Sequence, residues 1–312
     1  MSLDRALELA ERGRGTTWPN PIVGAVVVKN GEVVGEGWHE RQGGPHAEVA
    51  ALEAAGEKAR GGTLYVTQEP CTHHGRTPPC VDAVVKAGIA SVFAGSLDPH
   101  PQHGGGLERL QEAGVEVELV DSFEARRLNE AWRTWVARGR PFVTYKAAIT
   151  LDGRVTVPES RWVTGEESRR RVHELRAASD AVAVGMGTVR ADDPRLDARD
   201  VEPARQPRRL VFGTGPLPDG SELELLSGPL EEELARLGAA GVQSLLLEGG
   251  PTLATAFLRT SLVDKLMLFV APRVSGSGPR FLGDLEAPIG LSGIEVEPIG
   301  EDLLMTGYIH EP

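Results

Sequence analysis

The sequence Pro45-His46-Ala47-Glu48, followed by Glu69-Pro70-Cys71 and then by Cys80, organises the amino-terminal half of the chain. One imidazole and two thiolates are ligands that Zn²⁺ prefers, and three protein ligands leave a fourth position for water, as in catalytic zinc sites. Glu48 lies two residues from His46 and is better suited to transferring protons than to binding the ion. Since zinc lowers the pKa of bound water from about 15.7 to about 7, these residues predict activation of a water nucleophile.

Other interpretations of this motif stay open. The same residues could form a structural zinc site or include a pair of buried cysteines. His73 and His74 lie between the cysteines, so either could replace one thiolate. Structural zinc sites are almost always closed by four protein ligands, whereas a catalytic site needs only three. We therefore expect a catalytic site of one histidine and two cysteines.

Composition limits the class of protein. With 312 residues the chain exceeds the usual size of one domain, so two domains are expected. A net charge of −12 opposes binding to nucleic acid, whose phosphates attract Lys and Arg, and favours a small-molecule substrate. The amino terminus has no long apolar run, so we expect no signal peptide, no membrane span and a cytoplasmic location. In a reducing cytosol, two cysteines beside prolines indicate metal binding rather than a disulfide.

The first half of the chain alternates between predicted strands and helices, which is typical of a layered α/β domain. We expect helices at residues 3–13, 46–59, 80–87 and 106–113, and strands at 22–28, 33–37, 63–67, 91–94 and 115–119. Cys80 then lies at a helix N-terminus, where a thiolate is stabilised. A connecting helix and linker at 122–140 separate the two expected domains, 1–121 and 141–312.

The second half repeats the alternation. We expect strands at residues 142–149, 181–184, 210–212, 244–247 and 265–271, and helices at 168–178, from about 230, and through 259. The strand ending at Leu247 runs into Glu248-Gly249-Gly250-Pro251-Thr252, and a glycine turn before a helix presents backbone N–H groups to phosphate. The pair Gly185-x-Gly187 is a weak dinucleotide signal because Arg190 occupies the position of the third glycine.

The motifs resemble a known family. His-x-Glu with Pro-Cys matches the signature of zinc-dependent nucleobase deaminases. Ordinary cytidine and adenosine deaminases have two residues between their cysteines, whereas this chain has the eight residues 72–79. That longer insert resembles RibD, the bifunctional deaminase/reductase family of riboflavin biosynthesis. Residues 151–154, 161–164, 187–194 and 248–253 resemble the reductase domain of the same family.

The resemblance implies a fold and two consecutive reactions. It implies an α/β protein with an amino-terminal three-layer α/β/α cytidine-deaminase-like domain and a carboxyl-terminal dihydrofolate-reductase-like α/β domain. The first would hydrolyse the 2-amino group of 2,5-diamino-6-(5-phosphoribosylamino)pyrimidin-4(3H)-one, using Zn²⁺. The second would use NADPH to reduce the ribosyl group, giving 5-amino-6-(5-phosphoribitylamino)uracil. It also implies a homo-oligomer, either a dimer or a tetramer.

The resemblance further implies roles for individual residues. Asn20 and His39 would hold the base, and Arg76 would contact the substrate. The residues facing NADPH would be Ala148, Trp162, Thr188, Asp192, Gly250, Pro251, Thr252, Leu253, Ala254, Thr255 and Ala256. Those holding the ribosyl phosphate and ring would be Ser160, Arg176, Leu196, Arg199 and Glu248. Reduction of a sugar requires its ring-opened form and an acid near C1′, which Lys146 or Glu248 could supply.

Two segments depart from the pattern of the family. Residues 98–104 replace the usual Asp-Pro-Asn-Pro loop, and we expect His100 and His103 there to be solvated. Residues 213–215 are Gly-Thr-Gly where the family commonly has an Asp-Ser pair. This second change affects the contact to the 2′-phosphate, and therefore the preference for NADPH over NADH.

Two alternative functions stay open at this point. The first is a single-activity deaminase of free bases or tRNA whose carboxyl-terminal domain only binds a ligand. The acidic composition and the eight-residue spacing of the cysteines oppose it. The second is a non-catalytic, zinc-stabilised nucleotide-binding protein. If replacing Glu48 abolished ammonia release but left zinc bound, this alternative would be excluded.

Overall fold

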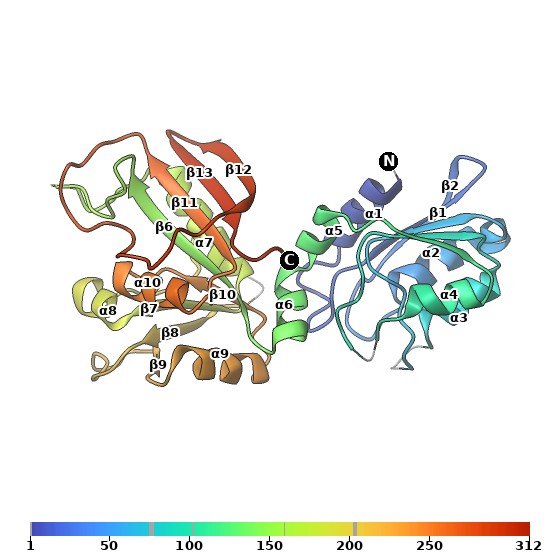
Figure 1. Cartoon of the computed structure of the whole chain (residues 1–312), viewed down its shortest axis with the longest axis horizontal. Coiled ribbons are helices and arrows are strands. Elements are labelled where there is room, and N and C mark those ends of the chain that lie inside the picture. Colours follow the sequence, from blue (N-terminus) through green and yellow to red (C-terminus); the bar gives the residue numbers. More distant parts are fainter. Residues whose placement is uncertain (1, 75–77, 102, 159, 202–204) are drawn as a thin grey trace. The chain divides into compact units, whose positions relative to one another are not determined.

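The computed structural model describes residues 2–74, 78–101, 103–158, 160–201 and 205–312 (Figure 1). The chain divides into two compact units, one up to Arg138 and the other at Gly139–Glu311. Each unit is built around its own β-sheet. Within the described residues, no helix combines the length and hydropathy that crossing a membrane would require.

The first unit has a five-stranded sheet in the order β2-β1-β3-β4-β5. Strand β1 is antiparallel to both of its neighbours, and β3, β4 and β5 run parallel. The elements of this unit are α1 (Ser2–Glu11), β1 (Gly24–Lys29), β2 (Glu32–Trp38), α2 (Ala47–Ala55), η1 (Gly56–Ala59), β3 (Thr63–Val66), α3 (Cys80–Ala87), β4 (Ser91–Ala94), α4 (Gly106–Glu112), β5 (Glu116–Leu119), α5 (Phe123–Leu128) and α6 (Glu130–Arg138).

Helices cover both faces of this sheet. The β-branched residues of β1 favour extended backbone, and their side chains point alternately to opposite faces. Ala25 and Val27 pack with residues of α2 and α3, whereas Val26 packs against Ala6 and Leu9 of α1. The first unit is therefore the three-layer α/β/α domain that was predicted.

The second unit has an eight-stranded sheet in the order β12-β13-β11-β6-β10-β7-β8-β9. The six strands from β11 to β9 in this order are parallel, and β13 and β12 add antiparallel pairs at one edge. The elements of this unit are β6 (Phe142–Thr150), α7 (Glu166–Ala178), β7 (Ala181–Gly185), α8 (Met186–Asp192), β8 (Arg208–Phe212), β9 (Glu224–Leu226), α9 (Leu230–Ala239), β10 (Ser244–Leu247), α10 (Pro251–Arg259), β11 (Lys265–Ala271), β12 (Ser292–Ile299) and β13 (Asp302–Tyr308).

The core of the second unit lies on both faces of its sheet. On one face, Val143 and Tyr145 of β6 pack with Phe257 of α10. On the other, Val182 and Val184 of β7 pack with residues of α8. Burial on both faces explains the nearly continuous apolar sequences of the parallel strands. The α/β class predicted for this half is confirmed.

Some elements differ from the sequence prediction. The single connecting helix expected within residues 122–140 forms two helices, with Asn129 between them. The side chain of Asn129 accepts from the Ile22 N–H at 2.9 Å and donates to the Ile22 carbonyl at 2.8 Å. Helix α8 was not predicted; burial of Met186 and Val189 outweighs the low helix propensity of Gly187. Strands β9, β12 and β13 were not predicted.

Candidate functional site

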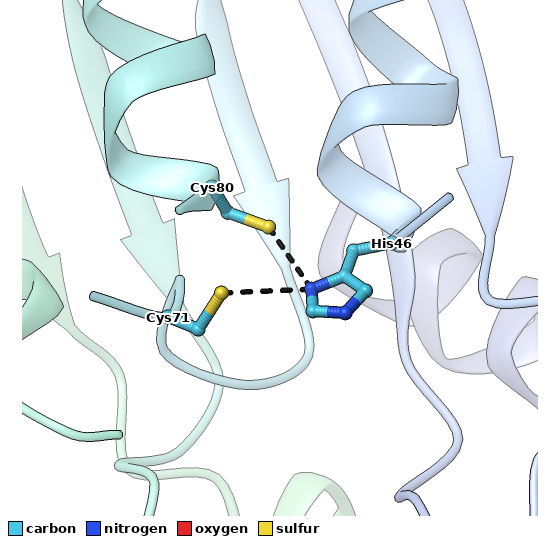
Figure 2. Close-up of side chains that lie close together, drawn as sticks. All are labelled: His46, Cys71 and Cys80. Atoms are coloured by element: carbon cyan, nitrogen blue, oxygen red, sulfur yellow. Dashed lines mark hydrogen bonds between the residues drawn. The ribbon is translucent and has the colours of Figure 1, made fainter. Parts of the chain in front are cut away.

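Three potential metal ligands converge in the first unit (Figure 2). His46 is the N-cap of α2, Cys80 is the first residue of α3, and Cys71 follows β3. The Nδ1 atom of His46 lies 3.2 Å from the sulfur of Cys80 and 3.5 Å from that of Cys71. All three ligand atoms lie within 4.8 Å of one another. This soft donor set, collected at one point, fits a zinc ion.

Close packing fixes the position of His46. Helix α2 lies directly on β2, where a Cβ atom on Gly35 would come within 2.3 Å of the Ala51 carbonyl oxygen. A Cβ atom on Gly37 would meet the Ala51 nitrogen at 2.4 Å. Only glycine permits this approach. The two glycines of β2 therefore determine where the N-terminus of α2 presents the imidazole.

The loop that carries Cys71 is held by the buried side chain of Glu69. One carboxylate oxygen accepts from the Leu107 N–H at 3.0 Å, and the other accepts from the Asp98 N–H at 3.2 Å. The Val81 N–H, in the first turn of α3, donates to the Cys71 carbonyl at 3.4 Å. The Glu-Pro-Cys sequence thus joins the loop at Asp98, the start of α4 and the first turn of α3 around the cysteine.

Hydrogen bonding distributes the protons within this group. A hydrogen bond from Cys80, helped by His46, lowers the pKa of Cys71 to about 4. The same contact with Cys71, together with burial, raises the pKa of Cys80. The hydrogen bond to Cys71 also raises the pKa of His46. A bound dication would favour the deprotonated form of all three ligands.

Glu48 and His39 border the three ligands. Glu48 is buried, and burial raises its pKa to about 7 while its carboxyl group hydrogen-bonds to Cys80. It stands outside the metal-binding group found among the described residues. The Nδ1 atom of His39 lies 3.0 Å from the Pro45 carbonyl, whereas its buried Nε2 atom has no hydrogen-bond partner in the described part of the chain. A buried imidazole nitrogen in this state is suited to receive a ligand.

The other residues considered for this site differ in where the structure places them. Asn20 is exposed, and Arg76 lies outside the described residues. His73 does not join the metal-binding group; its ring stacks on His103 with centroids 3.7 Å apart. The prediction that His100 and His103 are solvated is wrong, because both are half-buried and stack at 3.6 Å.

The second unit contains a cavity of about 1700 Å³ at the carboxyl ends of β7, β8 and β10. Ligands of open α/β sheets bind at this edge. Most of the predicted reductase residues line it: Lys146, Ala148, Trp162, Arg176, Thr188, Asp192, Leu196, Arg199, Glu248, Gly250, Pro251, Thr252, Leu253 and Ala256.

Three predicted residues are not in the cavity wall. Ala254 is fully buried in the core. The hydroxyl of Thr255 accepts from the Gly283 N–H at 2.8 Å, and the hydroxyl of Ser160 donates to the Trp162 carbonyl at 2.8 Å. Because α10 is a helix, the side chains at positions 254 and 255 point away from the cavity. The prediction of a continuous stretch from 250 to 256 did not take this helical period into account.

Two helix N-termini open onto this cavity. Gly185 is the N-cap of α8, and Gly250 is the N-cap of α10, with Pro251 at its first position. The first N–H groups of a helix lack intrahelical partners and carry partial positive charge. Two such ends beside one cavity fit the pyrophosphate of a dinucleotide.

A largely buried group of three charged residues, with side chains 11% to 14% exposed, lies in the cavity wall. Arg176 donates from Nε at 2.6 Å and from Nη2 at 3.0 Å to the two carboxylate oxygens of Glu248. The Nζ atom of Lys146 lies 3.7 Å from the same carboxylate. Burial opposes ionisation of Glu248, but Lys146 and Arg176 together lower its pKa. Burial lowers the pKa of Lys146.

Sequence reasoning missed several residues of this cavity, among them His173 and Arg169. His173 lines it one helical turn before Arg176, and spacing of three residues on one helix face was the signal that could have identified it. Arg169 also lines the cavity, and its guanidinium carbon lies 5.2 Å from the centroid of the Trp162 ring.

Comparison with known proteins separates the two halves in the same way. The family model "RibD C-terminal domain" matches residues 141–305, and the "Cytidine and deoxycytidylate deaminase zinc-binding region" matches residues 2–96. The riboflavin biosynthesis protein RibD of Aquifex aeolicus is 42% identical, over 96% of this chain and 95% of the relative. This chain belongs to the RibD family.

Solved RibD structures are similar over both halves. Acinetobacter baumannii RibD matches with a TM-score of 0.84 and 37% identity, over 98% of this chain and 97% of that one. A Thermotoga maritima protein described as a diaminohydroxyphosphoribosylaminopyrimidine deaminase/5-amino-6-(5-phosphoribosylamino)uracil reductase matches with a TM-score of 0.84 and 36% identity, over the same 98% and 97%.

RibD membership settles the broad activity. The chain is a bifunctional deaminase and reductase of riboflavin biosynthesis, it acts on a small molecule, and its cofactors are zinc and NADPH. The resemblance drawn from the sequence is confirmed. Neither the single-activity deaminase nor the non-catalytic nucleotide-binding protein agrees with this finding.

Proposed function

We propose that the first unit hydrolyses the 2-amino group of 2,5-diamino-6-(5-phosphoribosylamino)pyrimidin-4(3H)-one, and that the second reduces the deaminated product to 5-amino-6-(5-phosphoribitylamino)uracil. The first step is supported by the convergence of His46, Cys71 and Cys80 beside the buried carboxyl group of Glu48. The buried Lys146 and Glu248 pair in the cavity carries the second.

In the first step we assign zinc binding to the histidine and the two cysteines. Zinc, when bound, supplies a water of lowered pKa. Glu48 accepts a proton from the attacking water and delivers it to the departing amino group, which leaves as ammonia. The free Nε2 atom of His39 accepts a hydrogen bond from the pyrimidine ring. Asn20 and Arg76 complete the proposed contacts to the substrate.

In the second step we assign Lys146 as the proton donor. Ring opening breaks the bond between C1′ and O4′, leaving C1′ doubly bonded to the exocyclic nitrogen. Lys146 donates a proton to O4′, and NADPH, when bound, would supply the hydride that C1′ requires. Glu248 keeps Lys146 in place and is itself held by Arg176. Because Glu248 occupies one side of the Arg176 guanidinium, we assign the phosphate contact to Arg199.

The cofactor lies, in this proposal, across the two helix N-termini. The N–H groups at the starts of α8 and α10 hold the pyrophosphate, with Thr188 and Thr252 beside it. Trp162, Ala148 and Asp192 line the same cavity and contact the rest of NADPH.

One assay tests both halves of the proposal. The purified chain receives the diamino substrate with NADPH, and ammonia and NADPH are followed together. We expect one ammonia released and one NADPH oxidised per substrate consumed. Addition of the deaminated intermediate alone should oxidise NADPH without ammonia. If no NADPH is oxidised while ammonia release is intact, the reductase half of the proposal fails.

We also propose a cytoplasmic homo-oligomer that does not bind nucleic acid. The net charge of −12 supports the last part. Strand β12 lies at an edge of the sheet, and Ile294, Val296 and Leu303 expose 59%, 59% and 45% of their surfaces there. Exposed apolar side chains on an edge hairpin are suited to an interface. Sedimentation of the purified chain gives its mass in solution, and a monomer would contradict the oligomer.

A further inference from the structure

The loop at residues 193–200 has an unusual backbone. Asp193, Leu196 and Asp200 have positive φ angles of 40°, 56° and 61°. Aspartate tolerates this region, but a leucine there is strained. The side chain of Leu196 is 2% exposed, so its burial helps to retain the strained conformation. The loop, which carries Arg199 into the cavity wall, therefore depends on contacts from its neighbours.

Helix α7 holds this loop at two points. The Arg176 Nη1 atom donates to the Asp197 carbonyl at 3.2 Å. One turn earlier, the Nδ1 atom of His173 accepts from the backbone N–H of Arg199 at 3.4 Å. The helix that grips Glu248 through Arg176 thus also fixes the backbone of Arg199.

Gln206 provides a second support for the loop. The side-chain oxygen of Gln206 accepts from the Ala198 N–H at 2.9 Å, and its Nε2 atom donates to the Ala198 carbonyl at 2.8 Å. A side-chain amide that satisfies both backbone groups of one residue replaces the strand partner that the loop lacks.

The protonation state of His173 suits this role. Burial is the main cause that lowers the pKa of His173, and the nearby positive charges of Arg176 and Arg199 lower it further. The ring is therefore neutral near pH 7, and only a neutral imidazole has a nitrogen that can accept a hydrogen bond.

We propose that His173 is a positioning residue of the reductase, and that its Nδ1 atom holds the strained 193–200 loop so that Arg199 faces the phosphate-bearing end of the substrate. This inference rests on the proposed function of the cavity. By this inference, one face of α7 positions the groups that contact both ends of the substrate. Arg176 positions Glu248 at the end where the proton is transferred, and His173 positions Arg199 at the phosphate end.

Paired amide substitutions test the role of Nδ1. The side-chain oxygen of asparagine can take the place of Nδ1 as an acceptor, whereas the longer glutamine puts its amide near Nε2. We expect His173→Asn to keep KM for the deaminated substrate within about twofold of wild type. His173→Gln and His173→Ala should raise that KM about tenfold, the effect of losing one hydrogen bond to a loop that binds the substrate.

Several readouts separate positioning from general damage. KM for NADPH, kcat and ammonia release should stay within about twofold of wild type in every variant. Gln206→Ala should raise the substrate KM as His173→Ala does, because it removes the other support of the loop. His310→Asn replaces a half-buried histidine whose ring bonds to the Ser261 carbonyl; this variant is the matched control and should change nothing.

The outcomes that contradict the inference are distinct. Equal KM values in His173→Asn and His173→Gln would show that Nδ1 is not the working atom. A rise in the NADPH KM that parallels the substrate KM would show a general loss of structure. A wild-type protein that releases ammonia but oxidises no NADPH would overturn the proposed reductase itself, and this inference with it.

Discussion

Glu48 is 3% exposed and the side chain of Glu248 is 11% exposed, yet the pKa values of these two largely buried carboxyl groups move in opposite directions. Around Glu48, burial dominates and raises its pKa to about 7. Around Glu248, burial acts in the same sense but is outweighed by Lys146 and Arg176, so its pKa falls. Two neighbouring cations together outweigh burial at Glu248, whereas burial remains the dominant influence at Glu48.

The difference teaches what each carboxylate is suited to do. A carboxyl group with a pKa near neutrality can accept and return a proton within one catalytic cycle. A carboxylate whose pKa is lowered by two neighbouring cations is less suited to accept a proton, but it can fix the positions of those cations. In the proposed mechanism, Glu48 is therefore the proton carrier of the deaminase site, and Glu248 is an ionic support for Lys146, the proposed proton donor of the reductase site.

Replacing the proton carrier should have the largest effect. We expect Glu48→Gln to lower ammonia release about a thousandfold, since positioned acid-base groups contribute about 10² to 10⁴ in rate. Zinc content and NADPH oxidation on the deaminated intermediate should not change. Unchanged ammonia release would remove the proton relay, and loss of zinc would show that Glu48 is a ligand.

Replacing the ionic support should affect both activity and stability. Glu248→Gln leaves Lys146 and Arg176 buried without their anion, which costs about 3 to 5 kcal/mol in unfolding free energy. We expect NADPH oxidation to fall about a hundredfold, at the low end of acid-base contributions. Urea unfolding and steady-state kinetics measure the two effects.

A second ion pair provides the control for that prediction. Arg208 donates to Glu224 at 2.7 and 2.8 Å, but the Glu224 side chain is 45% exposed. Surface pairs contribute about 0 to 1 kcal/mol, so Glu224→Gln should change stability and activity little. Equal losses in Glu224→Gln and Glu248→Gln would contradict the special role of the buried pair.

The pH profile of the reductase tests the proton donor. The ammonium form of Lys146 is the acid, so activity should be lost as pH rises through its pKa. Because burial lowers that pKa, the loss should begin below the ordinary value of 10.5. In Lys146→Arg, whose charge persists above about pH 12, we expect lower activity with the alkaline loss moved to higher pH. If wild type and Lys146→Arg lost activity over the same alkaline pH range, another group would be responsible for that loss.

The smallest effect is expected at the rim of the cavity. Trp162 is 48% exposed, and Arg161 and Arg169 lie 5.0 and 5.2 Å from its ring centroid. An exposed cation–π contact contributes about 0.5 to 1 kcal/mol, so Arg169→Met should raise KM for NADPH about two- to fivefold. An unchanged KM would mean that Trp162 keeps its position without Arg169.

The sequence predicted the deaminase site better than the reductase site. His46, Cys71 and Cys80 lie within 34 residues of one another at a spacing that indicates metal binding, and the structure brings them together. The pairing of Arg176 with Glu248 spans 72 residues, so no local pattern could reveal it. Only the resemblance placed both in one site, and it assigned Arg176 to phosphate rather than to Glu248.

The missed elements have different physical causes. The β12–β13 hairpin carried a detectable signal, because Ile294 and Val296 alternate with two glutamates. Helix α8 had none, since Gly185 and Gly187 disfavour helix and only burial against the sheet stabilises it. Likewise, the stacking of His100 on His103 depends on the folded course of the 98–104 loop.

The most direct test of the account is X-ray absorption at the zinc edge, combined with metal analysis of the purified chain. We expect one zinc per chain, bound by one nitrogen at about 2.0 Å, two sulfurs at about 2.3 Å and one oxygen from water. Glu48→Gln should give the same spectrum. A fourth protein ligand, or a disulfide joining Cys71 to Cys80, would contradict the open metal site on which the proposed hydrolysis depends.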